Sequence, residues 1–194
     1  MPGFAGCSMM RATSAREDEA FLLCGLDEAG RGPLAGPVVA SAVILPDDFP
    51  RAILNDSKKL SVKKRELAEK IIKEKACWGI GIVSHTVIDK INILEASLLA
   101  MKKAYEALSA KFDGWRKAAG VSAKTICAVA DGTFCPDIEC ECRSEVKADA
   151  KYASVMAASI LAKTCRDTIM IEMDKLYPAY GYARHKGYPT AEHR

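Results

Sequence analysis

The hydrophobic positions of this chain form short continuous runs and longer segments in which they recur every three or four residues. Short runs rich in apolar and β-branched residues, bounded by glycine, proline or polar clusters, predict strands. These runs are Phe21–Glu28, Val38–Leu45, Cys77–Ser84, Thr125–Ala130 and the shorter Ser144–Ala148. Gly30 and Pro33 predict a turn after the first run, because glycine permits unusual backbone angles and proline lacks an N–H donor.

Three longer segments predict helices. The first begins after Ser61, a residue type that caps helices well, and runs to about Lys75. Its apolar face is formed by Leu60, Leu67 and Ile71.

The second predicted helix has the strongest pattern. Asn92 and Glu95 form a pair similar to a capping box at its start. The apolar stripe that follows consists of Leu94, Leu98, Met101, Tyr105, Leu108 and Phe112. We expect Lys111–Lys124 to be a polar link. The third helix is predicted from about Ala150 to Leu176, because Pro178 cannot continue it.

The order of these elements predicts a mixed sheet covered by helices. Strands joined by short turns tend to pair antiparallel, and strands separated by helices tend to lie parallel. The 194 residues suit one domain. We expect residues 1–20 to form an N-terminal extension and residues 21–194 to form the folded domain.

Composition and charge narrow the class of protein. Hydrophobic residues make up 49% and charged residues 27%, which is typical of a soluble globular domain. The longest apolar run, Pro37–Pro46, is too short for a membrane-spanning helix, which needs about 20 residues. No secretory signal is visible, so we expect a cytoplasmic protein, and a monomer. The basic stretch 51–75 is either a solvated helix surface or a surface that neutralises phosphates.

Eight cysteines raise the question of disulfides or zinc. In a chain of this length without an export signal, reduced thiols are expected. Cys135, Cys140 and Cys142 contain no CxxC pair, so we favour a thiol-rich loop over a zinc site.

The glycine-rich turn after the first strand does not fit a nucleotide-binding loop. Gly30, Gly32 and Gly36 lack the GxGxxG spacing, and Pro33 and Pro37 interrupt the helix that should follow. No phosphate-binding Lys-Ser pair follows either. These features argue against a nucleotide cofactor.

Carboxylates stand at the ends of the predicted core elements, namely Asp27, Glu28, Asp131 and Asp149. Carboxylates are seldom buried without partners, and oxygen ligands in this number suit hard divalent cations such as Mg²⁺ or Mn²⁺. Plainer explanations exist: Asp149 can cap the last helix, and Asp131 with Gly132 can form a turn. Asp27 and Glu28 point to opposite strand faces, so they share a site only if the strand ends or bulges there.

The segment Gly25–Val38 closely resembles the opening motif of ribonuclease HII, the type 2 RNase H family. Further blocks resemble that family in the same order: Asp56–Leu60, Asn92–Ser97, Asp131–Gly132, Lys147–Lys151, Ala157–Lys163 and Lys186–Thr190. The resemblance extends from about residue 21 to the end of the chain. The family normally continues with a basic helical tail, which we expect this chain to lack.

The resemblance implies an α/β, RNase H-like fold with a mixed five-stranded sheet flanked by helices. It also implies a metal-dependent endoribonuclease that cleaves the RNA strand of RNA–DNA hybrids and single ribonucleotides embedded in duplex DNA, leaving 3′-hydroxyl and 5′-phosphate ends. The implied cofactor is Mn²⁺ or Mg²⁺, and the implied partner is the hybrid or the ribonucleotide-containing duplex. A non-catalytic nucleic-acid-binding domain of the same fold is the alternative. Loss of an acid would favour it, and all four acids are present.

Residue by residue, the resemblance assigns catalytic metal binding to Asp27, Glu28, Asp131 and Asp149. It assigns Gly30, Arg31 and Gly32 to the loop that reads the ribose 2′-hydroxyl, the group that distinguishes RNA from DNA. Tyr188 corresponds to a tyrosine that packs on the neighbouring deoxyribose, although it can also be a packed aromatic of the tail. Phosphate contacts are expected from Lys58, Lys147, Lys151, Lys163 and Arg166.

Overall fold

The central sheet has five strands in the order β3-β2-β1-β4-β5. It belongs to a computed structural model that describes residues 21–55, 60–123, 125–191 and 193. The strands are β1 (Phe21–Ala29), β2 (Val38–Ile44), β3 (Cys77–Val83), β4 (Thr125–Asp131) and β5 (Glu141–Glu145). β1, β2 and β3 pair antiparallel, whereas β4 lies parallel to β1 and β5 lies parallel to β4. The expected mixed five-stranded sheet is therefore confirmed.

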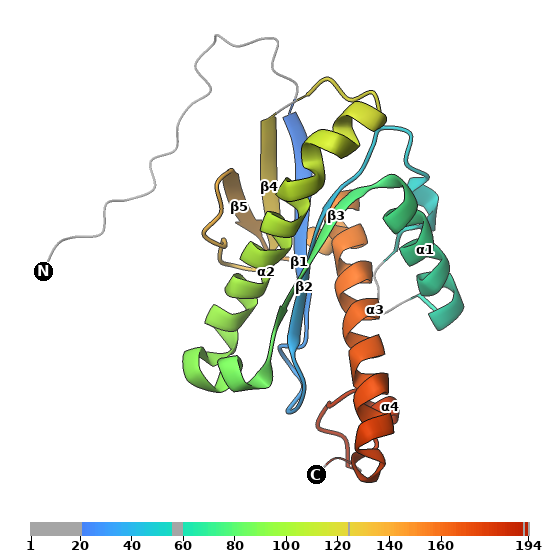
Figure 1. The fold of residues 1–194 in the computed structure, drawn as a ribbon, viewed down its shortest axis with the longest axis vertical. Helices are drawn as coiled ribbons and strands as arrows, with labels where there is room; N and C mark the ends of the chain where they lie inside the picture. The colour runs from blue at the N-terminus through green and yellow to red at the C-terminus, as the bar shows by residue number, and fades with distance from the viewer. Residues whose placement is uncertain (1–20, 56–59, 124, 192, 194) are drawn as a thin grey trace, which may run out of the picture.

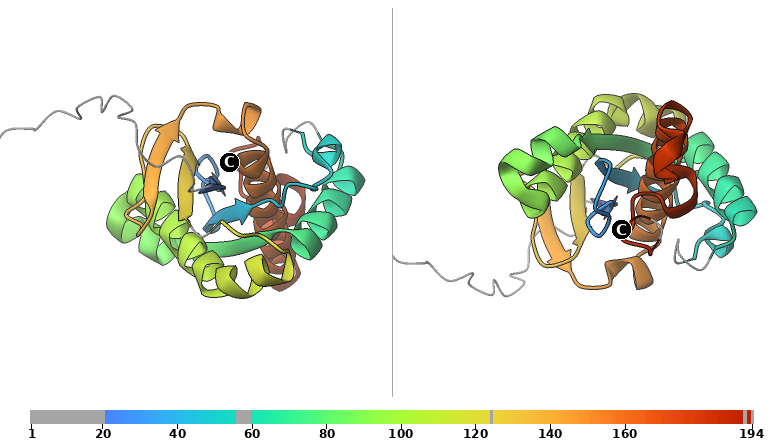
Figure 2. Two further views of the ribbon diagram at one scale, coloured as in Figure 1. Left: turned by 90° about the horizontal axis from the view of Figure 1, so that it is seen from above. Right: turned by 90° about the horizontal axis from the view of Figure 1, so that it is seen from below.

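Helices cover both faces of this sheet (Figures 1 and 2). The helix α2 (His85–Ala118) packs on one face, where Met101 and Leu108 share a core cluster with Leu26 of β1. The helices α1 (Val62–Lys75) and α3 (Ala153–Leu176) lie on the other face, around a second core cluster. The short helix α4 (Tyr182–His185) follows α3. Connections in the described part of the chain contain the 3₁₀ turns η1 (Arg51–Ile53), η2 (Ala148–Ala150) and η3 (Pro178–Tyr180).

The direction of β1 determines where chemistry can occur. β1 and its neighbour β4 run parallel, so their carboxyl ends meet at the same edge of the sheet. In open α/β sheets this edge is where ligands bind. The glycine-rich loop between β1 and β2 lies at the same edge, next to the chain segment that follows α4, as the view from below shows (Figure 2).

The helix α2 differs in length from the sequence prediction. Asn92 has φ 69°, and α2 is kinked there. The side-chain oxygen of Asn92 accepts hydrogen bonds from the N–H groups of Leu94 (2.9 Å) and Glu95 (3.1 Å). The cap predicted at Asn92 is therefore correct, but a further helical segment precedes it. The predicted polar link over Lys111–Lys124 was wrong, because the helix continues to Ala118.

Smaller differences concern the other elements. Leu67 was predicted on the apolar face of α1 but is exposed, and Ala68 and Ile72 are buried there instead. The last strand lies earlier than the predicted Ser144–Ala148. It ends at Glu145, and Lys147 then adopts left-handed backbone angles that lead into η2 rather than into a helix.

No helix within the described ranges is long and apolar enough to span a membrane. The described cysteines are free thiols. Cys135 in the β4–β5 connection donates its S–H to the backbone oxygen of Cys142.

Candidate active site

A cavity of about 590 Å³ opens at the carboxyl ends of β1 and β4. The four acids singled out from the sequence all line it, namely Asp27, Glu28, Asp131 and Asp149. So do the candidate recognition residues Gly30, Arg31, Gly32 and Tyr188. The fold thus brings together groups that are up to 161 positions apart in the sequence, from Asp27 to Tyr188.

Asp27 is the most buried of these acids, with 6% of its surface exposed. Its Oδ1 accepts a hydrogen bond from the N–H of Glu28 at 2.7 Å. Burial raises the pKa of Asp27 well above its ordinary value, and the negative charge of Glu28 raises it further, while a hydrogen bond from Ser159 opposes the shift. The ionised form of Asp27 is therefore short of compensating positive charge.

Glu28 reaches the same cavity although β1 continues to Ala29. The condition expected from the sequence, that the strand must end or bulge at these acids, was too strict. The Arg31 guanidinium lies 3.3 Å from Oε1 of Glu28. Burial raises the pKa of Glu28, and Arg31 partly offsets that rise. The other oxygen, Oε2, is buried and has no hydrogen-bond partner among the described residues.

Asp131 and Asp149 are connected through the backbone. Asp131 is the last residue of β4, and its Oδ1 accepts a hydrogen bond from the N–H of Ala148 at 2.7 Å. Ala148 begins η2, whose central residue is Asp149. Asp149 does not cap α3, because the N-cap position there is Tyr152. The capping explanation of Asp149 was therefore wrong, and Asp149 lines the cavity instead.

These acids suit divalent cations in their chemistry. Hard oxygen donors are the ligands that Mg²⁺ and Mn²⁺ prefer. The unpartnered buried oxygen of Glu28 and the mutual repulsion of the carboxylates are both relieved by a cation. As they stand, no three His, Cys, Asp or Glu side chains in the described part of the chain form a closed ligand group. The donor chemistry of the acids fits a divalent cation, although their side chains are not arranged as a closed ligand group.

The opposite wall of the cavity is formed by irregular segments. The ring of Tyr188 is 38% exposed. A Cβ on Gly32 would lie 3.7 Å from that ring, so the loop and the tyrosine are in contact distance. Leu34 donates its N–H to the backbone oxygen of Gly187 at 2.8 Å. Lys58, the predicted phosphate contact, lies outside the described residues.

The sequence model of the family described as ribonuclease HII matches residues 24–194. The chain belongs to the ribonuclease HII family. A ribonuclease HII from Dechloromonas aromatica is 50% identical over 173 residues, covering 89% of this chain and 82% of that protein. One from Treponema denticola is 51% identical over 176 residues, covering 89% of each. Membership makes the chain a metal-dependent endonuclease of the ribonuclease H class, a phosphodiester hydrolase.

Solved structures show the same fold. The ribonuclease H2 of Pyrococcus horikoshii superimposes with a TM-score of 0.64 at 24% identity, over 88% of this chain and 82% of that one. A Bst-RNase HIII in complex with Mn²⁺ also gives a TM-score of 0.64, at 18% identity, over 84% of this chain and 57% of that one. The RNase H-like fold expected of a ribonuclease HII is thereby confirmed.

The cavity also contains side chains that sequence reasoning did not single out. They are Arg65 of α1 and Ser159 of α3, which line it beside the predicted Lys163. Asp167 accepts hydrogen bonds from Lys163 (2.7 Å) and Arg65 (3.4 Å), which holds both cations at the cavity wall. The basic stretch 51–75 was the available signal for Arg65, but it does not say which of its cations faces the acids.

Arg166 corrects one expectation about phosphate contacts. It was grouped with the lysines as a phosphate contact, but its side chain is 1% exposed and donates to three backbone carbonyl oxygens. Lys163, in contrast, does line the cavity.

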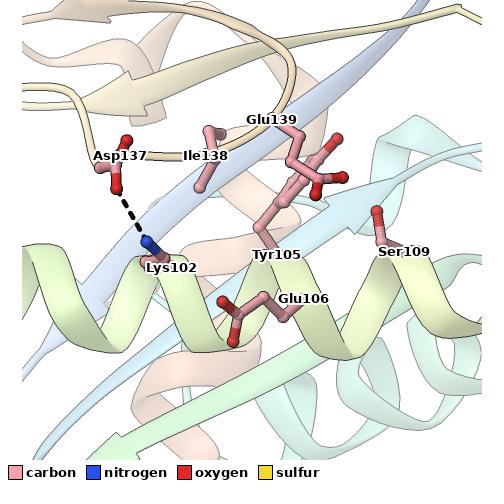
Figure 3. A pocket seen from close by; sticks show the side chains of 7 residues that line it. All are labelled: Lys102, Tyr105, Glu106, Ser109, Asp137, Ile138 and Glu139. Carbon is pink, nitrogen blue, oxygen red and sulfur yellow. Dashed lines mark hydrogen bonds and ion pairs between the residues drawn. The ribbon is translucent and has the colours of Figure 1, made fainter.

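A second cavity of about 450 Å³ lies between α2 and the β4–β5 connection (Figure 3). Its lining residues are Lys102, Tyr105, Glu106 and Ser109 of α2 and Asp137, Ile138 and Glu139 of the connection, and in Figure 3 Lys102 points toward Asp137. Lys102 neutralises Asp137 at 2.8 Å, and the Asp137 side chain is 95% exposed. Asp137 is thus solvated and paired, unlike the buried Asp27 of the first cavity, which is the candidate active site.

Proposed function

We propose that this chain cleaves the RNA strand of RNA–DNA hybrids and single ribonucleotides embedded in duplex DNA, leaving 3′-hydroxyl and 5′-phosphate ends. The observation that carries the proposal is the convergence of four acids in one cavity, among them Glu28, whose buried Oε2 has no hydrogen-bond partner in the described part of the chain. The names of the relatives support the same class of reaction.

Asp27, Glu28, Asp131 and Asp149 are proposed as the residues that hold Mn²⁺ or Mg²⁺. Two such ions, when bound, stabilise charge on the attacking and leaving oxygens of a phosphodiester. The Mn²⁺ in the Bst-RNase HIII structure is consistent with this choice of ion. Asp131 has a second task, because its Oδ1 accepts a hydrogen bond from the Ala148 N–H and so holds the turn that carries Asp149.

Recognition of the ribose is assigned to the opposite wall. Gly30, Arg31 and Gly32 line the cavity, and we assign to their backbone N–H and C=O groups the contacts to a 2′-hydroxyl, which can both donate and accept. The exposed face of Tyr188 offers a flat surface for the next sugar. Arg65 and Lys163 supply positive charge for the phosphates of the nucleic acid.

A non-catalytic binding domain of the same fold is the second candidate. It would not need four carboxylates at the site of an anionic ligand, because they repel phosphate unless cations lie between. Free thiols fit a reducing cytoplasm.

The test uses three labelled duplexes: all DNA, DNA with one ribonucleotide, and an RNA–DNA hybrid. With Mn²⁺ or Mg²⁺, the chain should cut the second and third and leave the first intact, and a chelator should stop cutting. Ligation and phosphatase treatment of the products report the ends. A chain that binds these duplexes but cuts none of them with either ion would support the binding-domain alternative.

A further inference from the structure

Arg166 is the largest fully buried side chain in the described part of the chain, and it is charged. Nε donates to the backbone oxygen of Pro37 at 2.9 Å, and Nη2 donates to that of Ala35 at 3.0 Å. Nη1 donates to the oxygen of Lys186 at 3.0 Å. A single guanidinium of α3 thus binds two segments that are about 150 positions apart in sequence.

The two segments, residues 30–37 and 186–188, form the wall of the cavity to which we assign ribose recognition, called the recognition wall below. Ala35 and Pro37 belong to the loop that contains Gly30 and Gly32, and Lys186 stands two residues before Tyr188. The Arg166 guanidinium also lies 5.9 Å from the centre of the Tyr188 ring. Arg166 does not itself line the cavity among the described residues.

The loop is shaped around this guanidinium. Gly30 and Gly36 have φ of 117° and 97°, angles that side-chain-bearing residues rarely adopt. A Cβ on Gly30 would lie 2.7 Å from Nε of Arg166, and one on Gly36 would lie 3.2 Å from Nη2. Gly30 therefore leaves space for Arg166 and for the Pro37 carbonyl, whereas at Gly36 a Cβ would meet Met170 Sδ first, at 2.4 Å.

Burying a guanidinium is costly unless its donors are satisfied. In the described part of the chain, carbonyl oxygens rather than carboxylates are the hydrogen-bond partners of Arg166. Lysine could keep the charge, but its single ammonium lacks the planar fork that reaches three separate oxygens. The geometry, more than the charge, explains the residue type.

We propose that Arg166 is a positioning residue that fixes the glycine-rich loop 30–37 relative to residues 186–188, so that the ribose and the following sugar are held in one geometry. This proposal rests on the proposed function of the cavity. It predicts that loosening Arg166 impairs cleavage without disturbing the metal site, because the four acids stand on β1, β4 and η2 instead.

The experiment compares Arg166→Lys and Arg166→Met with wild type, and uses Arg116→Lys as the matched control. Arg116 is paired with Asp113 on α2 and does not line the active-site cavity among the described residues. At saturating enzyme, the single-turnover rate at one embedded ribonucleotide should fall on the order of 10- to 100-fold in the Arg166 variants, as expected for a displaced reacting group. The increase in Tm on adding Mn²⁺ should be unchanged.

Two further readouts separate positioning from general loss of stability. The double variant Arg166→Lys, Tyr188→Ala should lose less cleavage rate than the product of the two single fold-losses. The reason is that both residues hold the same sugar-binding geometry. Amide hydrogen exchange should accelerate in residues 30–37 and 186–188 together, without substrate.

The proposal would be overturned if the Arg166 variants cleave at the wild-type rate. It would also be overturned if the rate loss of the double variant equals the product of the two single losses, or if amide exchange in the two segments is unchanged. So would failure of both variants to fold, since Arg166 would then be required for the fold as a whole. If wild type itself cuts no duplex, the proposed function fails, and the exchange data still decide whether Arg166 joins the two segments.

Discussion

The two walls of the cavity are built in different ways. The acidic wall stands on regular structure: Asp27 and Glu28 lie on the central strand β1, and Asp131 ends its parallel neighbour β4. The recognition wall consists of a glycine-rich loop and a segment after α4, joined by the bonds of Arg166 and the Leu34–Gly187 contact. In the proposed function, three of the four acids are therefore held by the sheet and Asp149 by η2, whereas the proposed recognition residues are held by a few long-range hydrogen bonds.

This difference predicts separable failures. Substitutions in the acidic wall should remove metal binding and cleavage while the fold persists. Substitutions in the recognition wall should slow cleavage while metal binding persists.

The largest effect is expected from Asp131→Asn. The amide oxygen can still accept the hydrogen bond from Ala148, so the fold should be kept, but a neutral amide is a weaker metal ligand. Cleavage should fall more than about 100-fold, because changes outside the ligand shell already cost 10- to 100-fold. Steady-state cleavage at saturating metal measures it, with Glu106→Gln in the second cavity as the control. Near-normal turnover of the Asp131 variant would show that Asp131 is not a required metal ligand.

Tyr188→Ala should slow cleavage at a single embedded ribonucleotide on the order of 100-fold, because a phosphate displaced by about 1 Å reacts far more slowly. Tyr188→Phe should reduce the cleavage rate only slightly, since in the proposed function the ring face rather than the hydroxyl contacts the sugar. The ring is partly exposed, so Tm should change little. If both variants lose stability together and cut at wild-type rates once folded, Tyr188 is a structural residue.

Gly32→Ala should have a smaller effect, about tenfold in cleavage. In the free protein the added Cβ meets only the Tyr188 ring at 3.7 Å, so the variant should fold normally. Against a bound sugar the same methyl group crowds the contact, and crowding of this kind typically costs 1–3 kcal/mol. Parallel measurements of Tm and of cleavage rate test this. A drop in Tm with no loss of cleavage would show that the loop does not approach the substrate at Gly32.

The smallest effect concerns stability in the absence of metal. Burial raises the pKa of Asp27 in the folded state above its pKa in the unfolded chain. The contribution of Asp27 to the free energy of unfolding is therefore fully present below about pH 4, and it is lost as the pH rises through the raised pKa. Asp27→Asn should therefore raise the Tm of the metal-free protein at neutral pH by a few degrees, at roughly 2–4 °C per kcal/mol. Thermal unfolding at pH 5 and pH 8 measures it, and Asp137→Asn is the solvated control. A lower Tm for Asp27→Asn at pH 8 would contradict the burial argument.

Much of the acidic wall could be predicted from the sequence, because each acid stands at a boundary that local patterns reveal. Asp131 follows a β-branched run, and Asp27 ends an apolar one. The cap at Asn92 was visible for the same reason. The helix before Asn92 was not, since the kink there interrupts the apolar period.

The recognition wall could be predicted only in part. Gly30, Gly32 and Tyr188 were found through resemblance to a family, but their contact depends on packing across the whole chain. Arg166 reads in the sequence as one more basic residue of a helix. Its partners, Pro37 and Ala35, are 129 and 131 positions away, and no local pattern records such bonds.

The central claim is that the acids on β1 and β4 bind the divalent cation that cleavage requires. Calorimetric titration of Mn²⁺ into wild type, into the Asp27→Asn, Asp131→Asn double variant and into Asp137→Asn tests it directly. The account predicts saturable binding to wild type and to the Asp137 control, and loss of that binding together with cleavage in the double variant. Wild-type Mn²⁺ affinity in a folded double variant would contradict it.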